Sequence, residues 1–229
     1  MLFDLRGRGR KNTVRVIYIL LAFLMGGGLV LFGIGGATNG GLVDAITGGG
    51  SSGDTGQKRF QQNETAALKR LQANPKDSAA YNDLIRAQLS LAGTGNRYDA
   101  NANTYTAAGK AQLRKAAATW TKYQALNPKL DDAQASLASR MVQAYSALGD
   151  SAGATSAQQV VAQNRNSSGA YSTLAVLAYQ AGNSRLGDLS SKKALSLTSK
   201  DLRQQLKQQL DAAKAQGAAS QSQAAQSTG

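Results

Sequence analysis

Two stretches that each read as a helix, a tight turn and a second helix follow one another toward the C-terminal end of this 229-residue chain. Their turns, Gly149-Asp150 and Gly182-Asn183, begin 33 residues apart. A glycine C-cap followed by an Asx turn suits a tight helical hairpin. Hairpins that recur about every 34 residues are typical of an α-solenoid, in which each hairpin packs against its neighbours. We therefore predict an all-α fold for this part of the chain.

The same interpretation extends back to residue 57. Only two prolines occur, Pro75 and Pro128, and each follows a stretch of helical pattern. Asp77 is well suited to cap the helix that follows it. We expect a helical domain over residues 57–216, with helices at 57–74, 78–93, 104–127, 131–149, 151–164, 168–182 and 184–198 and a polar capping helix at 201–216.

Residues 170–201 carry the clearest repeat. Seven of them follow an order of aromatic, leucine, small residue, glycine, small residue, alanine and leucine: Tyr171, Leu174, Ala175, Gly182, Gly187, Ala194 and Leu195. This pattern resembles the tetratricopeptide repeat (TPR) family, and about three such repeats fit residues 62–200. The chain departs from the family pattern at Ser199, which stands in a proline position, at Tyr123, which stands in an alanine position, and in an insertion near 93–105.

The resemblance implies a right-handed superhelix whose concave face, lined by the first helix of each hairpin, binds peptides or partner proteins. Transferred position by position, that face contains Asn82, Arg86, Leu89, Ser139, Gln143, Ser172, Val176, Tyr179 and Gln180. These residues are mostly uncharged. They do not reproduce the lysine and asparagine clamp with which some TPR proteins hold a C-terminal carboxylate.

Residues 16–36 form an uncharged run that differs from the rest of the chain. At about 1.5 Å per residue, a helix of this length covers roughly 31 Å, the thickness of the hydrocarbon core of a bilayer. Basic residues crowd the preceding segment, residues 1–15, and none follows until Lys58. The positive-inside rule therefore predicts a transmembrane helix with a cytoplasmic N-terminus and an extracytoplasmic C-terminal domain. A cleaved signal peptide is the alternative, although its apolar region is usually shorter.

The segments that flank the helical domain are rich in small and polar residues. Residues 37–56 contain many Gly, Ser and Thr residues and predict a flexible linker. Residues 217–229 have low complexity, and we expect them to be disordered. Within the apolar run, Ala22, Gly26 and Gly33 lie on much the same helical face. They suit close packing against another membrane helix or, alternatively, contact only lipid.

The residue types present exclude much catalytic chemistry. The chain has no Cys and no His, and Glu64 is its single glutamate. Cysteine or histidine nucleophile–base pairs and His/Cys zinc sites are therefore excluded. Ser190 and Lys193 match the S-x-x-K spacing of penicillin-binding enzymes, but the partner motifs are missing and the residues fall inside a repeat helix. We expect no enzyme activity, no cofactor and no metal site.

The net charge of +13 fits either attraction to an anionic partner or general solubility. Lys110, Arg114, Lys115 and Lys122 lie in one expected helix without a neighbouring acid. They form either a patch for anionic lipid or an acidic partner, or an ordinary solvated face. Nucleic acid would fit the charge, but it lies on the wrong side of the membrane in the expected topology, so we expect no nucleic-acid partner.

Together these features favour a bacterial, membrane-anchored protein whose TPR domain mediates protein–protein interactions in the cell envelope, as a scaffold or a chaperone-like adaptor. The architecture resembles that of YfgM-type ancillary factors of the Sec translocon. The alternative is an envelope module that binds anionic polymer or lipid through its basic helical face. The sequence does not identify the partner.

Overall fold

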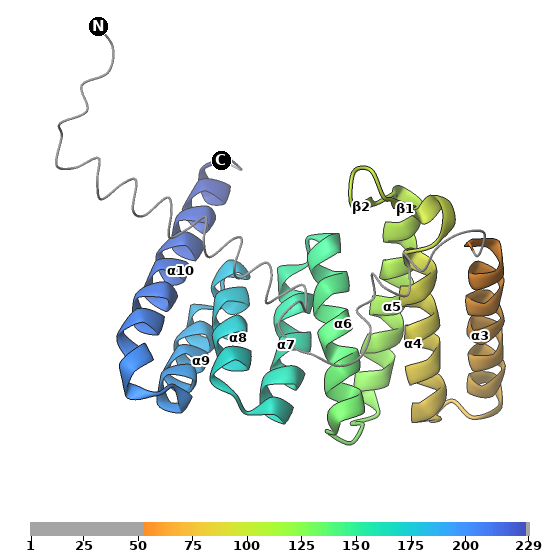
Figure 1. Ribbon diagram of the computed structural model, residues 1–229, viewed down its shortest axis with the longest axis horizontal. Coiled ribbons are helices and arrows are strands. Elements are labelled where there is room, and N and C mark those ends of the chain that lie inside the picture. The colour runs from red at the N-terminus through yellow and green to blue at the C-terminus, as the bar shows by residue number, and fades with distance from the viewer. Residues whose placement is uncertain (1–52, 228–229) are drawn as a thin grey trace, which may run out of the picture. The chain divides into compact units, whose positions relative to one another are not determined.

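The fold is all-α, as the sequence predicts. The computed structural model describes residues 53–227, and eight α-helices account for most of them (Figure 1). They are α3 (Gly53–Ala73), α4 (Ser78–Ala92), α5 (Ala107–Ala125), α6 (Asp132–Leu148), α7 (Ser151–Arg165), α8 (Ser168–Gln180), α9 (Ser184–Leu197) and α10 (Lys200–Ser227).

Within residues 53–227, no helix has the length and the apolar character needed to cross a bilayer. The transmembrane helix predicted at 16–36 lies outside the described residues, and so do its Ala22, Gly26 and Gly33. The predicted cytoplasmic tail, residues 1–15, lies outside them as well. The membrane anchor therefore stays a prediction from sequence.

The helix ends follow from local chemistry. Six helices begin after a residue whose side-chain oxygen accepts a hydrogen bond from a backbone N–H three residues further on, which satisfies an otherwise free donor. These capping residues are Asp77, Thr106, Asp131, Asp150, Ser167 and Asn183. Gly149 and Gly182 have φ values of 74° and 79°, a left-handed conformation that glycine adopts without strain. Both expected Gly-Asx turns are therefore present.

The helices pack in chain order as antiparallel neighbours, so that Figure 1 shows them side by side from α3 to α10. The closest pairs are α4 with α5, α6 with α7, and α8 with α9, and these are the three hairpins. In addition, α4 contacts α6, and α10 contacts both α8 and α9. This arrangement is that of a helical repeat, with α3 before the first hairpin and α10 after the last.

The main hydrophobic core runs through α4, α5, α6 and α7. Ile85, Leu113, Leu137 and Met141 are its largest fully buried side chains. Trp120 of α5 is 3% exposed and belongs to the same cluster. A second cluster joins α8, α9 and α10 around Ala175, Tyr179, Ala194 and Leu210. Each hairpin therefore buries its apolar residues against the neighbouring hairpin as well as within itself.

A polar network fixes α3 against the first hairpin. The carboxylate of Glu64 in α3 accepts hydrogen bonds from the amide nitrogens of Gln88 in α4 (3.4 Å) and Gln112 in α5 (3.2 Å). The side-chain oxygen of Gln88 in turn accepts a hydrogen bond from the Thr119 hydroxyl (2.9 Å). Buried polar groups that are satisfied in this way favour one register of packing. The network therefore sets the position of α3 next to α4.

The structure of the C-terminal end of the described chain differs from the prediction. Residues 217–229 were expected to be disordered, but α10 continues to Ser227. Gly217 is buried, and a Cβ atom there would lie 2.6 Å from the Tyr179 carbonyl oxygen. The amide of Gln221 donates a hydrogen bond to that same oxygen (3.3 Å). Contacts with α8 therefore hold a sequence that would be a weak helix on its own.

Smaller differences concern the other loops. Helix α3 begins at Gly53, inside the predicted linker 37–56. The insertion between α4 and α5 contains a 3₁₀ turn, η1 (Gly95–Arg97), and a short antiparallel pair of strands, β1 (Tyr98–Asp99) and β2 (Thr104–Tyr105). The rings of Tyr98 and Tyr105 pack edge to face across this pair, with 5.2 Å between centroids. The insertion is therefore an ordered hairpin and not an irregular loop.

Candidate interaction surface

The predicted binding surface lies on the first helices of the hairpins, α4, α6 and α8, and we call it the first-helix face. Gln143 and Gln180 are exposed, and five of its members are partly buried: Asn82, Arg86, Ser139, Ser172 and Val176. The other two were placed there wrongly. Leu89 is 5% exposed and Tyr179 is 3% exposed, so both are core side chains that a partner could not reach.

Three arginines lie on or beside this face: Arg86 of α4, Arg140 of α6 and Arg165 of α7, which we call the arginine cluster. The Arg86 Nε donates a hydrogen bond to the Asn82 side-chain oxygen (2.5 Å). The Arg165 Nη2 lies 3.5 Å from the Ser139 hydroxyl, to which it donates. Among residues 53–227, no carboxylate forms an ion pair with any of the three. The cluster is therefore uncompensated in the described part of the chain.

The pKa of Arg140 indicates that its guanidinium lies near that of Arg86. Arg140 is partly buried on α6, and α6 contacts α4, which carries Arg86. Burial lowers the pKa of Arg140, and the charge of Arg86 lowers it further. Both groups stay protonated at neutral pH because an arginine pKa lies far above it. Two like charges on adjacent first helices therefore repel each other, and a carboxylate between them would relieve the repulsion.

Sequence reasoning missed Arg140 and Arg165. Arg140 follows Ser139, which was included, but its contribution depends on the packing of α6 against α4. Arg165 lies in the last turn of α7, the second helix of its hairpin, and reaches the face only through its bond to Ser139. A scan for basic residues on first helices that lack an acid three or four positions away would have found Arg140.

At the α8 end, the face is covered by α10. Val176 packs against the core cluster that contains Leu210 of α10. The Tyr179 hydroxyl donates to Asp188 (2.8 Å), and the Lys214 ammonium of α10 donates to the same carboxylate (2.7 Å). The hydrogen bond from Lys214, followed by that from Tyr179, lowers the pKa of Asp188. This end is tied down by polar contacts, which leaves α4 and α6 as the open part of the face.

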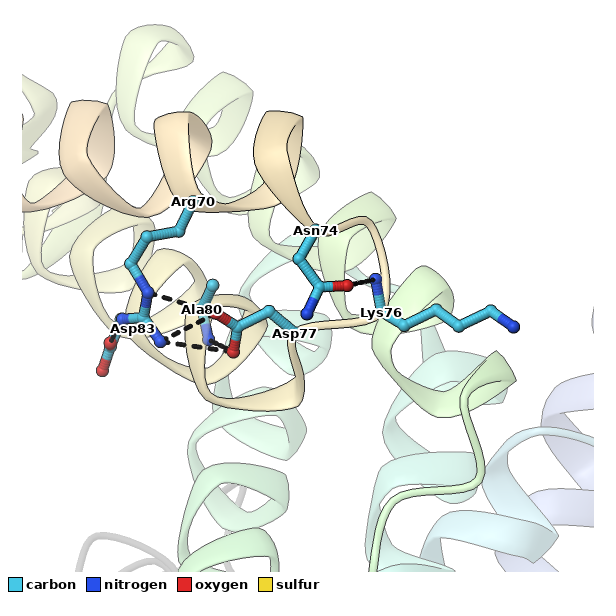
Figure 2. Close-up of polar contacts among 6 residues, drawn as sticks. All are labelled: Arg70, Asn74, Lys76, Asp77, Ala80 and Asp83. Carbon is cyan, nitrogen blue, oxygen red and sulfur yellow. Dashed lines mark hydrogen bonds and ion pairs between the residues drawn. The ribbon is translucent and has the colours of Figure 1, made fainter.

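A groove of about 400 Å³ lies between α3 and α4. Arg70 lies at its edge, where its guanidinium pairs with Asp83 (2.7 Å) and with Asp77 (3.0 Å), as Figure 2 shows. Asp77 also accepts a bond from the backbone N–H of Ala80 as the cap of α4 (2.9 Å). That backbone bond is the main reason why the pKa of Asp77 is lowered. Arg70 therefore has its charge neutralised by two carboxylates, unlike Arg86, which lines the same groove.

The basic patch predicted on α5 is present as a set of side chains on one helix. Arg114, Lys115 and Lys122 are exposed, and Lys110 is partly buried. None of them forms an ion pair with a carboxylate of residues 53–227. Helix α5 is the second helix of its hairpin, so the patch and the arginine cluster lie on different helices.

Residues 53–227 contain no group of three or more Asp, Glu, His or Cys side chains placed to hold a metal ion. The buried side-chain atoms without a hydrogen-bond partner in this part of the chain are scattered: Arg97 Nη1, Gln124 Nε2 and Gln134 Oε1. They lie in η1, α5 and α6 and do not converge on one cavity.

No protein-family model, curated protein or solved structure matches the chain. The function must therefore be argued from the residue pattern, the helical hairpins and the surfaces described above.

Proposed function

We propose that this chain is a single-pass membrane protein whose extracytoplasmic, TPR-like domain binds partner proteins as a scaffold or a chaperone-like adaptor for exported or envelope proteins. The observation that carries the proposal is the arginine cluster on the open part of the first-helix face. Arg86 and Arg140 are partly buried and have no carboxylate partner among residues 53–227, which is unfavourable for the chain on its own. A partner that supplies carboxylates would stabilise the complex.

The cluster also indicates which partner segments fit. Arginine forms planar, two-bonded contacts with carboxylates, and such charge-assisted bonds are stronger than neutral ones. Gln143 and Ser139 lie beside the arginines and offer neutral hydrogen-bonding groups for a peptide backbone. An extended segment with Asp or Glu residues suits this surface. The hairpin order and the Tyr, Leu, Gly and Ala positions of 170–201 support the TPR-like assignment.

The proposed position of the TPR-like domain outside the cytoplasm rests on the sequence. The uncharged run 16–36 and the basic residues before it favour an N-terminus in the cytoplasm and a domain outside it. An acidic partner segment on an exported protein would meet the arginine cluster there.

Because the chain has no cysteine, a single Gln143→Cys variant gives a unique handle on the first-helix face. In spheroplasts, we expect a membrane-impermeant maleimide to label Cys at this position without lysis. With a thiol-linked photocrosslinker, we expect crosslinks to other proteins, reduced about tenfold or more when Arg86 and Arg140 are both replaced by Gln, since charged pairs contribute about 1.5–3 kcal/mol each. Labelling and crosslinked bands on gels are the measurements.

The matched control is Ser156→Cys, an exposed position on α7. It should be labelled equally but crosslinked little. Labelling that requires lysis would contradict the proposed topology. Equal crosslinking from both positions would contradict the proposal that partners bind at the first-helix face. The two parts of the proposal therefore fail separately.

The unpaired basic patch on α5 favours a second candidate function, the binding of an anionic envelope polymer or lipid. Replacing Lys110, Arg114 and Lys115 by Gln should then weaken retention of the detergent-solubilised chain on an immobilised polyanion. A basic residue near an anionic surface contributes about 1 kcal/mol, so we expect a loss on the order of 100-fold at low salt. The control replaces Arg185, Lys192 and Lys193 of α9 by Gln. Equal losses in both variants would indicate net charge and not a patch.

A further inference from the structure

The repeat geometry shows which helices pack against α4 and α8. Helix α4 contacts α5, the second helix of its own hairpin, and α6, the first helix of the next. Helix α8 likewise contacts α9 and α10. In both cases a first helix packs against its own second helix and against the helix that follows the hairpin. By the same rule, the groove between α3 and α4 is the place for a helix that would precede α3.

Equivalent positions on successive helices support this comparison. Ala87 and Ser90 of α4 line the groove next to α3. The residues 57 positions later, Ala144 and Ala147 of α6, belong to or pack against the core cluster that also contains Ile85 and Leu89 of α4. The face of α6 that is covered by the preceding hairpin is thus the face that α4 presents to the groove.

The groove has the chemistry of a helix-binding site. Phe60, Ala66 and Ala67 of α3 and Ala87 of α4 supply apolar or small side chains, and small residues allow a helix to approach closely. Among its charged lining residues, Arg70 is paired with Asp83, whereas Arg86 bonds to the neutral Asn82 and is the cation that remains to bind a carboxylate. Within the described part of the chain, no helix occupies it.

We propose that the α3/α4 groove binds an amphipathic helix of a partner protein, one that presents small apolar residues to Phe60 and Ala66 and a carboxylate to Arg86. The bound helix completes a hairpin with α3, as α4 does with α5. This site shares Arg86 with the arginine cluster but lies between α3 and α4, and it takes a helix where the first-helix face takes an extended segment. Charge and shape at the groove select an acidic helix over a neutral or basic one.

The test uses the full chain in detergent and two synthetic peptides of about 20 residues, long enough to be helical in water. Both carry Ala and Leu on one face. The first has Glu at the flanking positions, and its neutral twin has Gln. By fluorescence anisotropy, we expect the Glu peptide to bind at least tenfold more tightly, a preference that Arg86→Gln removes. Ala66→Trp, at an exposed position in the groove, should fill it and weaken both peptides by tenfold or more.

Ala118→Trp is the matched control, at an exposed position of α5 outside the groove, and should leave binding unchanged. Circular dichroism shows whether each variant is folded. Equal binding of the two peptides, or binding that survives Ala66→Trp, would overturn the proposal. So would self-association of the full chain that Ala66→Trp abolishes, because the occupant would then be a second copy. Crosslinking from Gln143→Cys should persist in Ala66→Trp, so the proposed function and this site are tested independently.

Discussion

Replacing Trp120 by alanine is expected to lower the free energy of unfolding by about 3–5 kcal/mol, the usual cost of removing a large buried aromatic side chain. Trp120 is 3% exposed and lies in the cluster that joins α4, α5, α6 and α7. Its ring centroid lies 5.7 Å from that of Tyr123, which in turn lies 6.3 Å from that of Tyr81 in α4. Loss of the indole would leave a cavity at the junction of the first two hairpins.

The effect is large because a domain of this size is stable by only about 5–15 kcal/mol. Urea unfolding followed by circular dichroism measures it. The control is Leu202→Ala in α10, where the side chain is 56% exposed and the expected change is within about 0.5 kcal/mol. A loss below about 1 kcal/mol for Trp120→Ala would mean that the two hairpins do not share a core at this residue.

The sequence predicted the helical hairpins well because their ends depend on local chemistry. Gly149-Asp150 and Gly182-Asn183 each need a left-handed glycine and a side-chain cap, and both are visible as dipeptides. Pro75 and Pro128 mark two further ends in the same way. The C-terminal tail was predicted wrongly because its helix depends on Tyr179, a residue about 40 positions away. Composition alone gives no indication of such a contact.

The errors on the first-helix face have a common geometric cause. Leu89 and Tyr179 each follow, by three residues, a partly buried member of the predicted face, Arg86 and Val176. A step of three residues turns the side chain by about 60° from the starting direction. That turn brings Leu89 into the core shared with α6 and Tyr179 into the core shared with α10. Helical periodicity gives the side of a helix, but only the neighbouring helices decide whether that side is open.

A tyrosine and a glycine meet in the same way in the second and third hairpins, and this recurrence leads to the second large effect. A Cβ atom at Gly153 of α7 would lie 2.3 Å from the ring of Tyr145, and one at Gly187 of α9 would lie 2.3 Å from the ring of Tyr179. Both tyrosines are nearly buried, at 7% and 3% exposed. The absent side chain allows the two helices of each hairpin to approach. The spacing of eight residues from Tyr to Gly is the sequence signal of this contact.

Gly187→Ala is therefore expected to destabilise the domain by about 1–3 kcal/mol, the typical cost of overpacking a core. This sign is opposite to that of an ordinary helical Gly→Ala change, which stabilises by up to about 1 kcal/mol. Gly169→Ala in α8 provides that ordinary case, since a Cβ atom there meets nothing within 4 Å. Gly153→Ala should have the same sign, because a Cβ atom there would meet the ring of the nearly buried Tyr145.

A double-mutant cycle identifies the cause. If the ring of Tyr179 opposes the new methyl group, Gly187→Ala should cost much less in a Tyr179→Ala background, with a coupling of about 1 kcal/mol or more. Thermal unfolding of the four proteins measures this coupling. If Gly187→Ala stabilised the chain as Gly169→Ala does, the ring would be free to move. The close approach of α8 and α9 would then come from other contacts, such as Ala194 against Ala175 in the second core cluster.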